Sequence, residues 1–237
     1  MVYYMSKSSY KTLIRMAAQD FREYETLHLK HYSPHKYARG EYTYSSSNFL
    51  VRWLFWYRLR RILEHLKDCK PGRVIDIGCG EGALLLTLAK IFEQCVGVDL
   101  NVEAAKKLMQ HHGVENVSLI QGDFAEMTFK EDYFDLVTAT DVLEHIPDLS
   151  GFVKRIKKIL NPDGLFILTI PSENFFYVMG RKLFGFSQKE DSCPHLYNAK
   201  QIINILKGEF EILEREFIPL NLSPLVSAFY LVKVKKR

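Results

Sequence analysis

Residues 73–83 read RVIDIGCGEGA, a short apolar run that is followed by three glycines within five positions. The apolar run predicts a strand buried on both faces, and the glycines predict a tight turn into a helix. Such a turn lets the backbone approach a ligand closely and points the N–H groups of the helix toward it. The stretch therefore predicts a ligand-binding loop, formed by Asp76, Gly78, Cys79, Gly80 and Gly82.

The chain beyond this loop alternates short β-rich runs with helical patterns. Strands are expected at Arg73–Ile77, Val96–Asp99, Val117–Gln121, Phe134–Ala139, Leu165–Ile170, Glu211–Ile218 and Ala228–Lys235. Helices are expected from Gly82 to about Phe92 and at Val102–His112, Leu149–Leu160 and Asn198–Lys207, with a turn at Asn161–Gly164. This alternation predicts an α/β fold with a doubly wound, mostly parallel sheet, whose last two strands form an antiparallel edge.

Two regions fall outside the alternation. Residues 1–70 are expected to form a helical, very aromatic N-terminal region that covers the acceptor side, and residues 71–237 the main domain. Residues 171–197 make a long, apolar connection after the fifth strand of the main domain, and long connections in compact domains are usually functional. We interpret this connection as a lid insertion.

Composition excludes several classes of protein. Hydrophobic residues make up 47% of the 237 residues and the net charge is +4, so the chain is an ordinary globular one and no nucleic-acid partner is expected. The four cysteines form no CxxC pair, so neither a metal site nor a disulfide framework is expected, and reduced thiols favour a cytoplasmic location. Neither a secretory signal nor a membrane-spanning run is expected.

The glycine loop alone does not identify its ligand. The spacing of Gly78, Gly80 and Ala83 also fits the dinucleotide-binding pattern, and Asp99 could accept both ribose hydroxyls of either kind of cofactor. Asp76 favours a cofactor with a free amino group, since a carboxylate would repel a pyrophosphate. In the run QGDF, Asp123 could read the amino edge of adenine, and Phe124 could supply an apolar wall.

The runs VIDIGCGEG, VGVDL, QGDF and FDLVTATDVLEHIPD together resemble the ordered motifs of class I S-adenosylmethionine-dependent methyltransferases. They are most similar to the small-molecule branch that includes ubiquinone-biosynthesis O-methyltransferases. The resemblance covers roughly residues 73–170 and implies a seven-stranded, Rossmann-like sheet and S-adenosyl-L-methionine as cofactor. It implies that the three glycines contact the methionine part, that Asp99 binds the ribose, that Leu100, Asp123 and Phe124 surround the adenine, and that Thr140 and Asp141 lie beside the sulfonium.

Methyl transfer needs alignment of the donor with a nucleophile, and a base to remove the acceptor's proton. His145, after the fourth predicted strand, and His195, before a helix, are the candidate bases, although each could be a structural residue instead. Two other functions remain open, a nicotinamide-dependent oxidoreductase and a non-catalytic cofactor-binding subunit.

The acceptor is expected to be small, and lipophilic or aromatic, with O-methylation favoured. Aromatic and basic residues are interleaved in residues 49–63 and again in residues 175–186. Ordinary core packing explains part of this pattern, but it also suits an apolar lid or contact with a membrane surface. We therefore expect a lipid-like acceptor and peripheral membrane contact.

Overall fold

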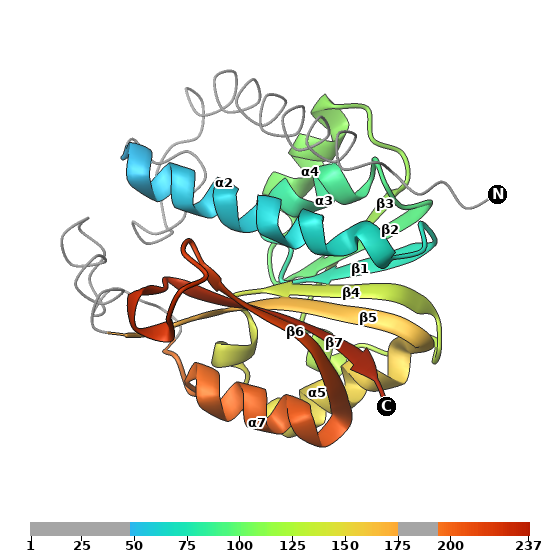
Figure 1. Ribbon diagram of the computed structural model, residues 1–237. Helices are drawn as coiled ribbons and strands as arrows, with labels where there is room; N and C mark the ends of the chain where they lie inside the picture. The colour runs from blue at the N-terminus through green and yellow to red at the C-terminus, as the bar shows by residue number, and fades with distance from the viewer. Residues whose placement is uncertain (1–47, 175–193) are drawn as a thin grey trace.

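The computed structural model describes residues 48–174 and 194–237, which form a three-layer α/β fold (Figure 1). Within these residues a seven-stranded sheet has the order β3-β2-β1-β4-β5-β7-β6. The strands are β1 (Arg73–Ile77), β2 (Gln94–Asp99), β3 (Val117–Gln121), β4 (Phe134–Thr140), β5 (Leu160–Pro171), β6 (Phe210–Ile218) and β7 (Phe229–Lys236). The first five run parallel, and β7 is antiparallel to both β5 and β6. The predicted doubly wound sheet is confirmed.

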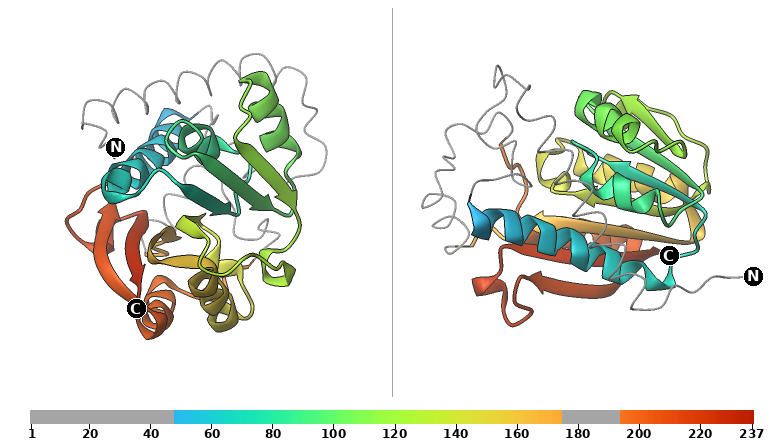
Figure 2. Two further views of the ribbon diagram at one scale, coloured as in Figure 1. Left: turned by 90° about the vertical axis from the view of Figure 1, so that its right-hand side faces the viewer. Right: turned by 90° about the horizontal axis from the view of Figure 1, so that it is seen from above.

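Helices cover both faces of the sheet (Figures 1 and 2). On one face lie α2 (Phe49–Glu64), α3 (Ala83–Leu88) and α4 (Glu103–His111), and on the other α5 (Leu149–Ile159) and α7 (Ala199–Glu209). Each face has its own apolar core: Leu59, Leu85 and Leu108 belong to the first, and Phe152, Phe166 and Leu206 to the second. A layered sheet of this kind needs apolar side chains on both of its faces, which explains the continuous apolar runs of the central strands.

The order of the strands reverses at β1. Strands β2 and β3 follow on one side of β1, whereas β4 and β5 lie on the other. In register, Asp76 of β1 pairs with Gly97 of β2 and with Thr138 of β4. Helices that diverge from such a reversal leave a crevice at the carboxyl ends of the two central strands, where ligands bind in open α/β sheets.

The predicted turn at Asn161–Gly164 is wrong, because these residues belong to β5. The register between β4 and β5 shifts between Phe134 and Leu136, so the four residues form an irregularity inside the strand. Asp135 holds it in place: its carboxylate accepts hydrogen bonds from Asn161 Nδ2 at 2.7 Å and from the Arg73 backbone N–H at 2.8 Å. Asparagine, proline and glycine favour turns and bulges alike, and only pairing with a partner strand separates the two.

Helix α2 begins at the N-cap Asn48, whose side chain accepts hydrogen bonds from Leu50 N and Val51 N. Its buried face carries Leu59, Ile62 and Leu63, which belong to the same apolar core as α3 and α4. The described end of the predicted N-terminal region, residues 48–70, thus packs directly on the main domain. The boundary at residue 70 stays a prediction, and residues 1–47 and most of the predicted lid, 175–193, lie outside the described residues.

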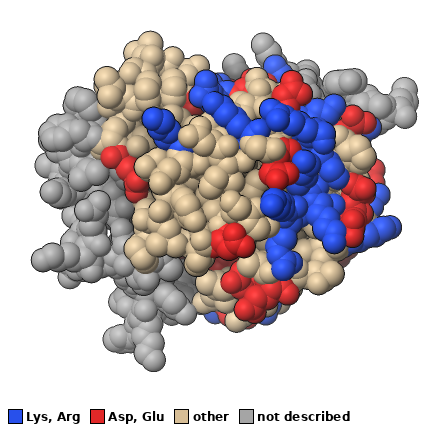
Figure 3. Space-filling model, turned by 90° about the horizontal axis from the view of Figure 1, so that it is seen from below, with Lys and Arg blue, Asp and Glu red and all other residues tan. Residues whose placement is uncertain are grey.

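The surface below the sheet carries basic side chains interspersed with acidic ones (Figure 3). Several of its lysines form ion pairs, Lys157 with Glu209, Lys158 with Glu131 and Lys235 with Asp163. In the described ranges, no helix is both long and apolar enough to cross a membrane. Cys79 and Cys95, both buried, are free thiols.

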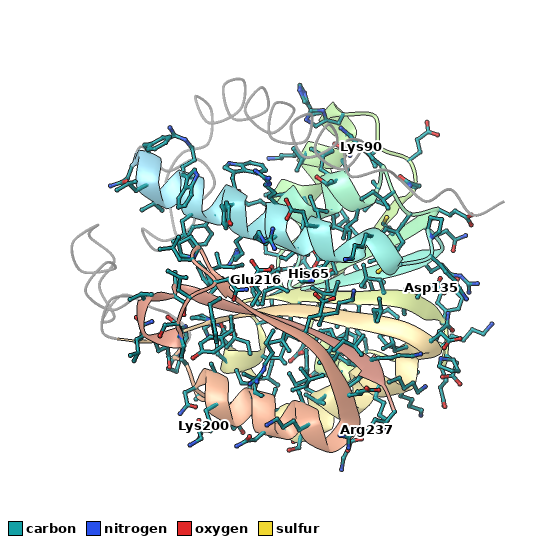
Figure 4. The ribbon with its side chains drawn as sticks, viewed as in Figure 1. His65, Lys90, Asp135, Lys200, Glu216 and Arg237 are labelled. Atoms are coloured by element: carbon teal, nitrogen blue, oxygen red, sulfur yellow. The ribbon has the colours of Figure 1, made fainter. Side chains whose placement is uncertain are left out.

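A buried polar network fixes the end of α2 to the antiparallel edge of the sheet (Figure 4). Arg61 forms a bidentate pair with Glu216 of β6, at 2.6 and 2.8 Å, and His65 Nε2 lies 2.9 Å from the same carboxylate. Burial alone would raise the pKa of Glu216, but hydrogen bonds from His65 and Arg61 outweigh it and lower the pKa to about 2. The carboxylate is therefore held in its charged form.

We expect Glu216→Gln to lower the free energy of unfolding by about 2–3 kcal/mol at neutral pH, because it removes the buried carboxylate that pairs with Arg61 and His65. The pKa of Glu216 is about 2 when folded against an ordinary 4.5, so its stabilisation is complete above pH 4.5 and is lost as the pH falls from 4.5 to 2. Urea unfolding of both proteins over this pH range measures the difference. Glu211→Gln, an exposed change on the same strand, is the control, and an equal loss in both variants would contradict the prediction.

Candidate functional site

Three glycines shape the loop at the end of β1. Gly78, Gly80 and Gly82 all have positive φ angles, of 71°, 51° and 84°. The backbone N–H groups of Gly78 and Cys79 both donate to Val98 O of β2, at 2.8 and 3.1 Å. Burial raises the pKa of the Cys79 thiol, which is therefore neutral. Cys79 thus contributes its backbone and its packing to the loop.

Gly78 also fixes the distance between this loop and the end of β4. A Cβ atom on Gly78 would lie 2.4 Å from Val142 Cγ2, which is far inside van der Waals contact. A side chain at this position would push the two loops apart and would also be strained at φ +71°. At Gly80, by contrast, a Cβ would meet no atom within 4 Å, so the space beside the loop is open there.

Asp99 connects the end of β2 to the glycine loop. Its carboxylate accepts a hydrogen bond from the Gly80 N–H at 2.8 Å with one oxygen, and from the Asn101 N–H at 3.0 Å with the other. A carboxylate has about four acceptor positions, so two backbone bonds leave capacity for a diol. Next to it Leu100 is 69% exposed, an apolar side chain that faces solvent beside the carboxylate.

Asp76 is buried at the end of β1 and accepts a hydrogen bond from Thr138 Oγ1 at 2.7 Å. Burial raises the pKa of Asp76 from 3.8 to about 7; the bond from Thr138 opposes this rise, and the charge of Asp99 adds to it. A buried carboxyl with this pKa gains its charge readily when a cation approaches. A cationic amino group would provide such a partner, as the sequence predicts.

The predicted adenine residues are placed at the end of β3. Asp123 is exposed and caps the short 3-10 helix η2 (Phe124–Glu126), accepting a hydrogen bond from Ala125 N at 2.8 Å. Phe124 is buried in the second core, stacked on Phe129 and edge-on to Phe152. Their contacts with adenine stay a prediction.

Asp141 follows Thr140 at the end of β4 and has φ +56°, a left-handed backbone conformation that residues other than glycine seldom adopt. Thr169 Oγ1 donates to Asp141 Oδ1 at 2.9 Å. Arg58 of α2 forms a close ion pair with the other carboxylate oxygen of Asp141. The end of β4 is thus tied to a helix 83 positions earlier in the chain.

The two histidines that the sequence singled out lie together. The ring centroids of His145 and His195 are 4.8 Å apart, and the Leu196 N–H donates to Glu144 O at 2.7 Å, which joins the two loops. His195 Nδ1 forms a short hydrogen bond with the Glu173 carboxylate. His145 belongs to the 3-10 helix η3 (Leu143–His145) after β4, at the crevice end of the sheet.

Glu144 lies close to the two histidines and is almost fully buried. Neither of its carboxylate oxygens has a hydrogen-bond partner among the described residues. Burial raises the pKa of Glu144 to about 7, which the charge of Arg58 opposes. The sequence predicted no metal site, but Glu144, His145 and His195 offer ligand atoms within 4.8 Å of one another and could hold a divalent cation.

Three residues that sequence reasoning missed take part in these contacts. Arg58, Glu173 and Thr138 each touch a predicted site residue from a distant part of the chain. For Arg58 there was a signal: a charged residue three positions after Phe55, on the apolar face of α2. Glu173 and Thr138 carry no comparable local signal.

The chain is similar to known protein families and curated proteins. The family described as "Methyltransferase domain" matches residues 50–209, well over half of the chain. The chain belongs to this family. A ubiquinone biosynthesis O-methyltransferase of Azorhizobium caulinodans is 36% identical over 44% of this chain and 42% of its own length. A sterol 24-C-methyltransferase of Aspergillus fumigatus is 32% identical over 61% of this chain and 41% of its own length.

The fold is shared with solved structures as well. The N-methyltransferase NodS of Bradyrhizobium japonicum, solved in complex with S-adenosyl-L-homocysteine, has a TM-score of 0.63 at 19% identity, over 84% of this chain and 93% of that one. The chain therefore has the class I methyltransferase fold. It spans about two fifths of the length of the curated relatives it matches, so the family and the fold do not by themselves define its reaction.

The described residues fit S-adenosylmethionine, the cofactor of this class. The open space at Gly80 admits a ligand against the backbone, and Asp99 with Leu100 offers an acid beside an exposed apolar side chain. Asp76 offers a buried carboxyl near neutrality, which suits the amino group of the methionine part. A pyrophosphate would have to approach both carboxyl groups, so a dinucleotide fits this site poorly.

We expect the affinity for S-adenosylhomocysteine to fall as the pH drops below 7, by up to about tenfold per unit, because the cationic amino group favours ionised Asp76. Above the pKa of about 7 the affinity should level off. Calorimetry across this range measures it, and Asp76→Asn should remove the pH dependence. Asp99→Ala is the comparison: it should weaken binding at every pH, by roughly 1–3 kcal/mol. If the affinity of Asp76→Asn still depended on pH, the dependence would belong to another titratable group.

Proposed function

We propose that the chain transfers a methyl group from S-adenosylmethionine to a small, lipophilic acceptor, most readily to an oxygen, with His195 as the base. The observation that carries this proposal is the pairing of His195 Nδ1 with the Glu173 carboxylate, beside His145. A carboxylate on one ring nitrogen holds the proton there and leaves Nε2 as an acceptor. Such a histidine can take a proton from an acceptor hydroxyl.

Bound at the glycine loop, S-adenosylmethionine supplies an electrophilic methyl group on a sulfonium. His195 Nε2 would take the proton of the acceptor hydroxyl as that oxygen accepts the methyl group, and the cofactor would leave as S-adenosylhomocysteine. Glu173 stabilises the imidazolium that forms, and the proton then leaves to solvent. A hydroxyl acceptor must lose its proton as it attacks, whereas a neutral amine can attack through its lone pair, so such a base favours O-methylation.

Apolar side chains exposed at one end of the molecule support a lipophilic acceptor. Leu222 and Leu225, in the connection between β6 and β7, are 79% and 70% exposed. Phe49 and Trp53, in the first turns of α2, are exposed at the same end (Figures 1 and 2). Phe55 of α2 contacts Phe229 at the start of β7, so the two groups are neighbours. Relatives named for ubiquinone biosynthesis and for a sterol are consistent with an apolar acceptor.

The base is tested by turnover with labelled methyl donor on pools of phenols, lipids and small amines. We expect His195→Ala to lower kcat by about a hundredfold or more and Glu173→Gln by less, with the affinity for S-adenosylhomocysteine near normal in both. His145→Ala shows whether the second histidine shares the role, and His111→Ala, an exposed histidine of α4, is the control. Full activity in His195→Ala would refute the assignment of His195 as the base. Loss on chelation that a divalent cation reverses would favour a metal site at Glu144, His145 and His195 instead.

Membrane contact is tested by co-sedimentation with vesicles of anionic and of neutral lipid. If the exposed apolar end docks on lipid, replacing Trp53, Leu222 and Leu225 by Ser should reduce binding at least severalfold, since each buried apolar side chain contributes roughly 1.5–3 kcal/mol. Leu213→Ser, an exposed leucine of β6, is the matched control. The predicted aromatic segment 175–186 lies outside the described residues, and these variants do not alter it. Absence of binding by the unmodified chain would reject membrane contact.

A further inference from the structure

We propose that Arg58 is a positioning residue that holds Asp141, and with it the turn that packs against the glycine loop, so that cofactor binding depends on helix α2. The inference rests on the proposed function, in which S-adenosylmethionine binds at that loop. It adds a residue from outside all the methyltransferase motifs to the cofactor machinery.

The Arg58 side chain is fixed from several sides. It is only 4% exposed, and its guanidinium lies 4.6 Å from the ring centroid of Phe55 and 4.7 Å from that of Phe229. One of these rings belongs to α2 and the other to β7. A buried charge without a counter-charge would be strongly destabilising, so this guanidinium requires the carboxylate that it contacts. That carboxylate is Asp141.

Asp141 in turn needs external support. Its φ of +56° is a strained conformation for a residue with a side chain and persists only where the surroundings enforce it. Support comes from two elements: Thr169 of β5 binds one carboxylate oxygen and accepts the Asp141 N–H at 3.2 Å, while Arg58 of α2 binds the other oxygen. Removing Arg58 would leave the β5 contacts alone to hold the turn.

The turn at Asp141 continues into the glycine loop. The next residue, Val142, occupies the space where a side chain of Gly78 would be, so the two loops are in direct contact. A movement of the Asp141–Val142 turn therefore changes the wall against which the glycine loop packs. This gives a continuous path of contacts from α2, through Arg58, Asp141 and Val142, to the cofactor loop.

A second arginine of the same helix provides a matched comparison. Arg61 also anchors α2 to the sheet, through its pair with Glu216 of β6, but among the described residues it pairs with neither Asp141 nor the glycine loop. Loss of either arginine weakens the attachment of α2. Only loss of Arg58 removes a partner of Asp141.

We test this with S-adenosylhomocysteine binding by calorimetry, alongside thermal unfolding to confirm that each variant folds. Arg58→Met should weaken binding at least tenfold, whereas Arg61→Met should change it less than twofold, even though both lower the unfolding midpoint. Arg58→Lys keeps the charge but loses the planar guanidinium that lies between the two rings, so it should fall in between. If Arg58→Met does not fold, Arg58→Lys against Arg61→Lys makes the same comparison.

A double-variant cycle shows whether Arg58 acts through Asp141. Asp141→Asn should itself weaken binding, and adding Arg58→Met to it should cost less than a further twofold, because the partner has already lost its charge. Equal binding by Arg58→Met and the unmodified chain would overturn the proposal, as would equal losses in Arg58→Met and Arg61→Met. Absence of binding by the unmodified chain would instead overturn the proposed function.

Discussion

The close contact between Gly78 and Val142 is the constraint on which the site depends. With no side chain on Gly78, the loop after β1 packs directly against the turn after β4, at the point where the chain reverses direction across the sheet. The carboxyl groups of Asp76, Asp99 and Asp141 then lie at the ends of three adjacent strands. Any side chain at position 78 would separate the β1 and β4 halves of this crevice.

Local environment shifts the pKa values of three buried carboxyl groups in different directions. Asp76 and Glu144 lie in surroundings where burial dominates, and the pKa of each rises to about 7. Glu216 is also buried, but His65 and Arg61 donate to it and its pKa falls to about 2. The first two can change charge near neutral pH when a ligand or proton arrives, whereas Glu216 is a fixed charge. Glu216 differs from the two site carboxyl groups in its charged hydrogen-bond partners, and it is also less deeply buried than they are.

Helix α2 packs on the main domain and also contacts the end of β4. Its apolar face completes the first core, and its two arginines reach the sheet at separate places, Arg61 at β6 and Arg58 at the end of β4. The methyltransferase family match likewise begins within this helix, at residue 50. A segment that looks in sequence like an aromatic extension therefore packs into the first core and pairs with residues of the sheet.

The sequence by itself determined the sheet, the glycine loop and the family, because buried parallel strands and glycine turns impose short-range patterns of burial and backbone conformation. It also selected His145 and His195, but it could not place them together or pair His195 with Glu173. It read Asn161–Gly164 as a turn, since turn and bulge share the same residue types. Only the tertiary structure decided the pairing of Arg58 with Asp141 and the burial of Glu144 close to the histidines. These contacts join residues far apart in the chain, and the effect of each charge depends on the residues that pack around it.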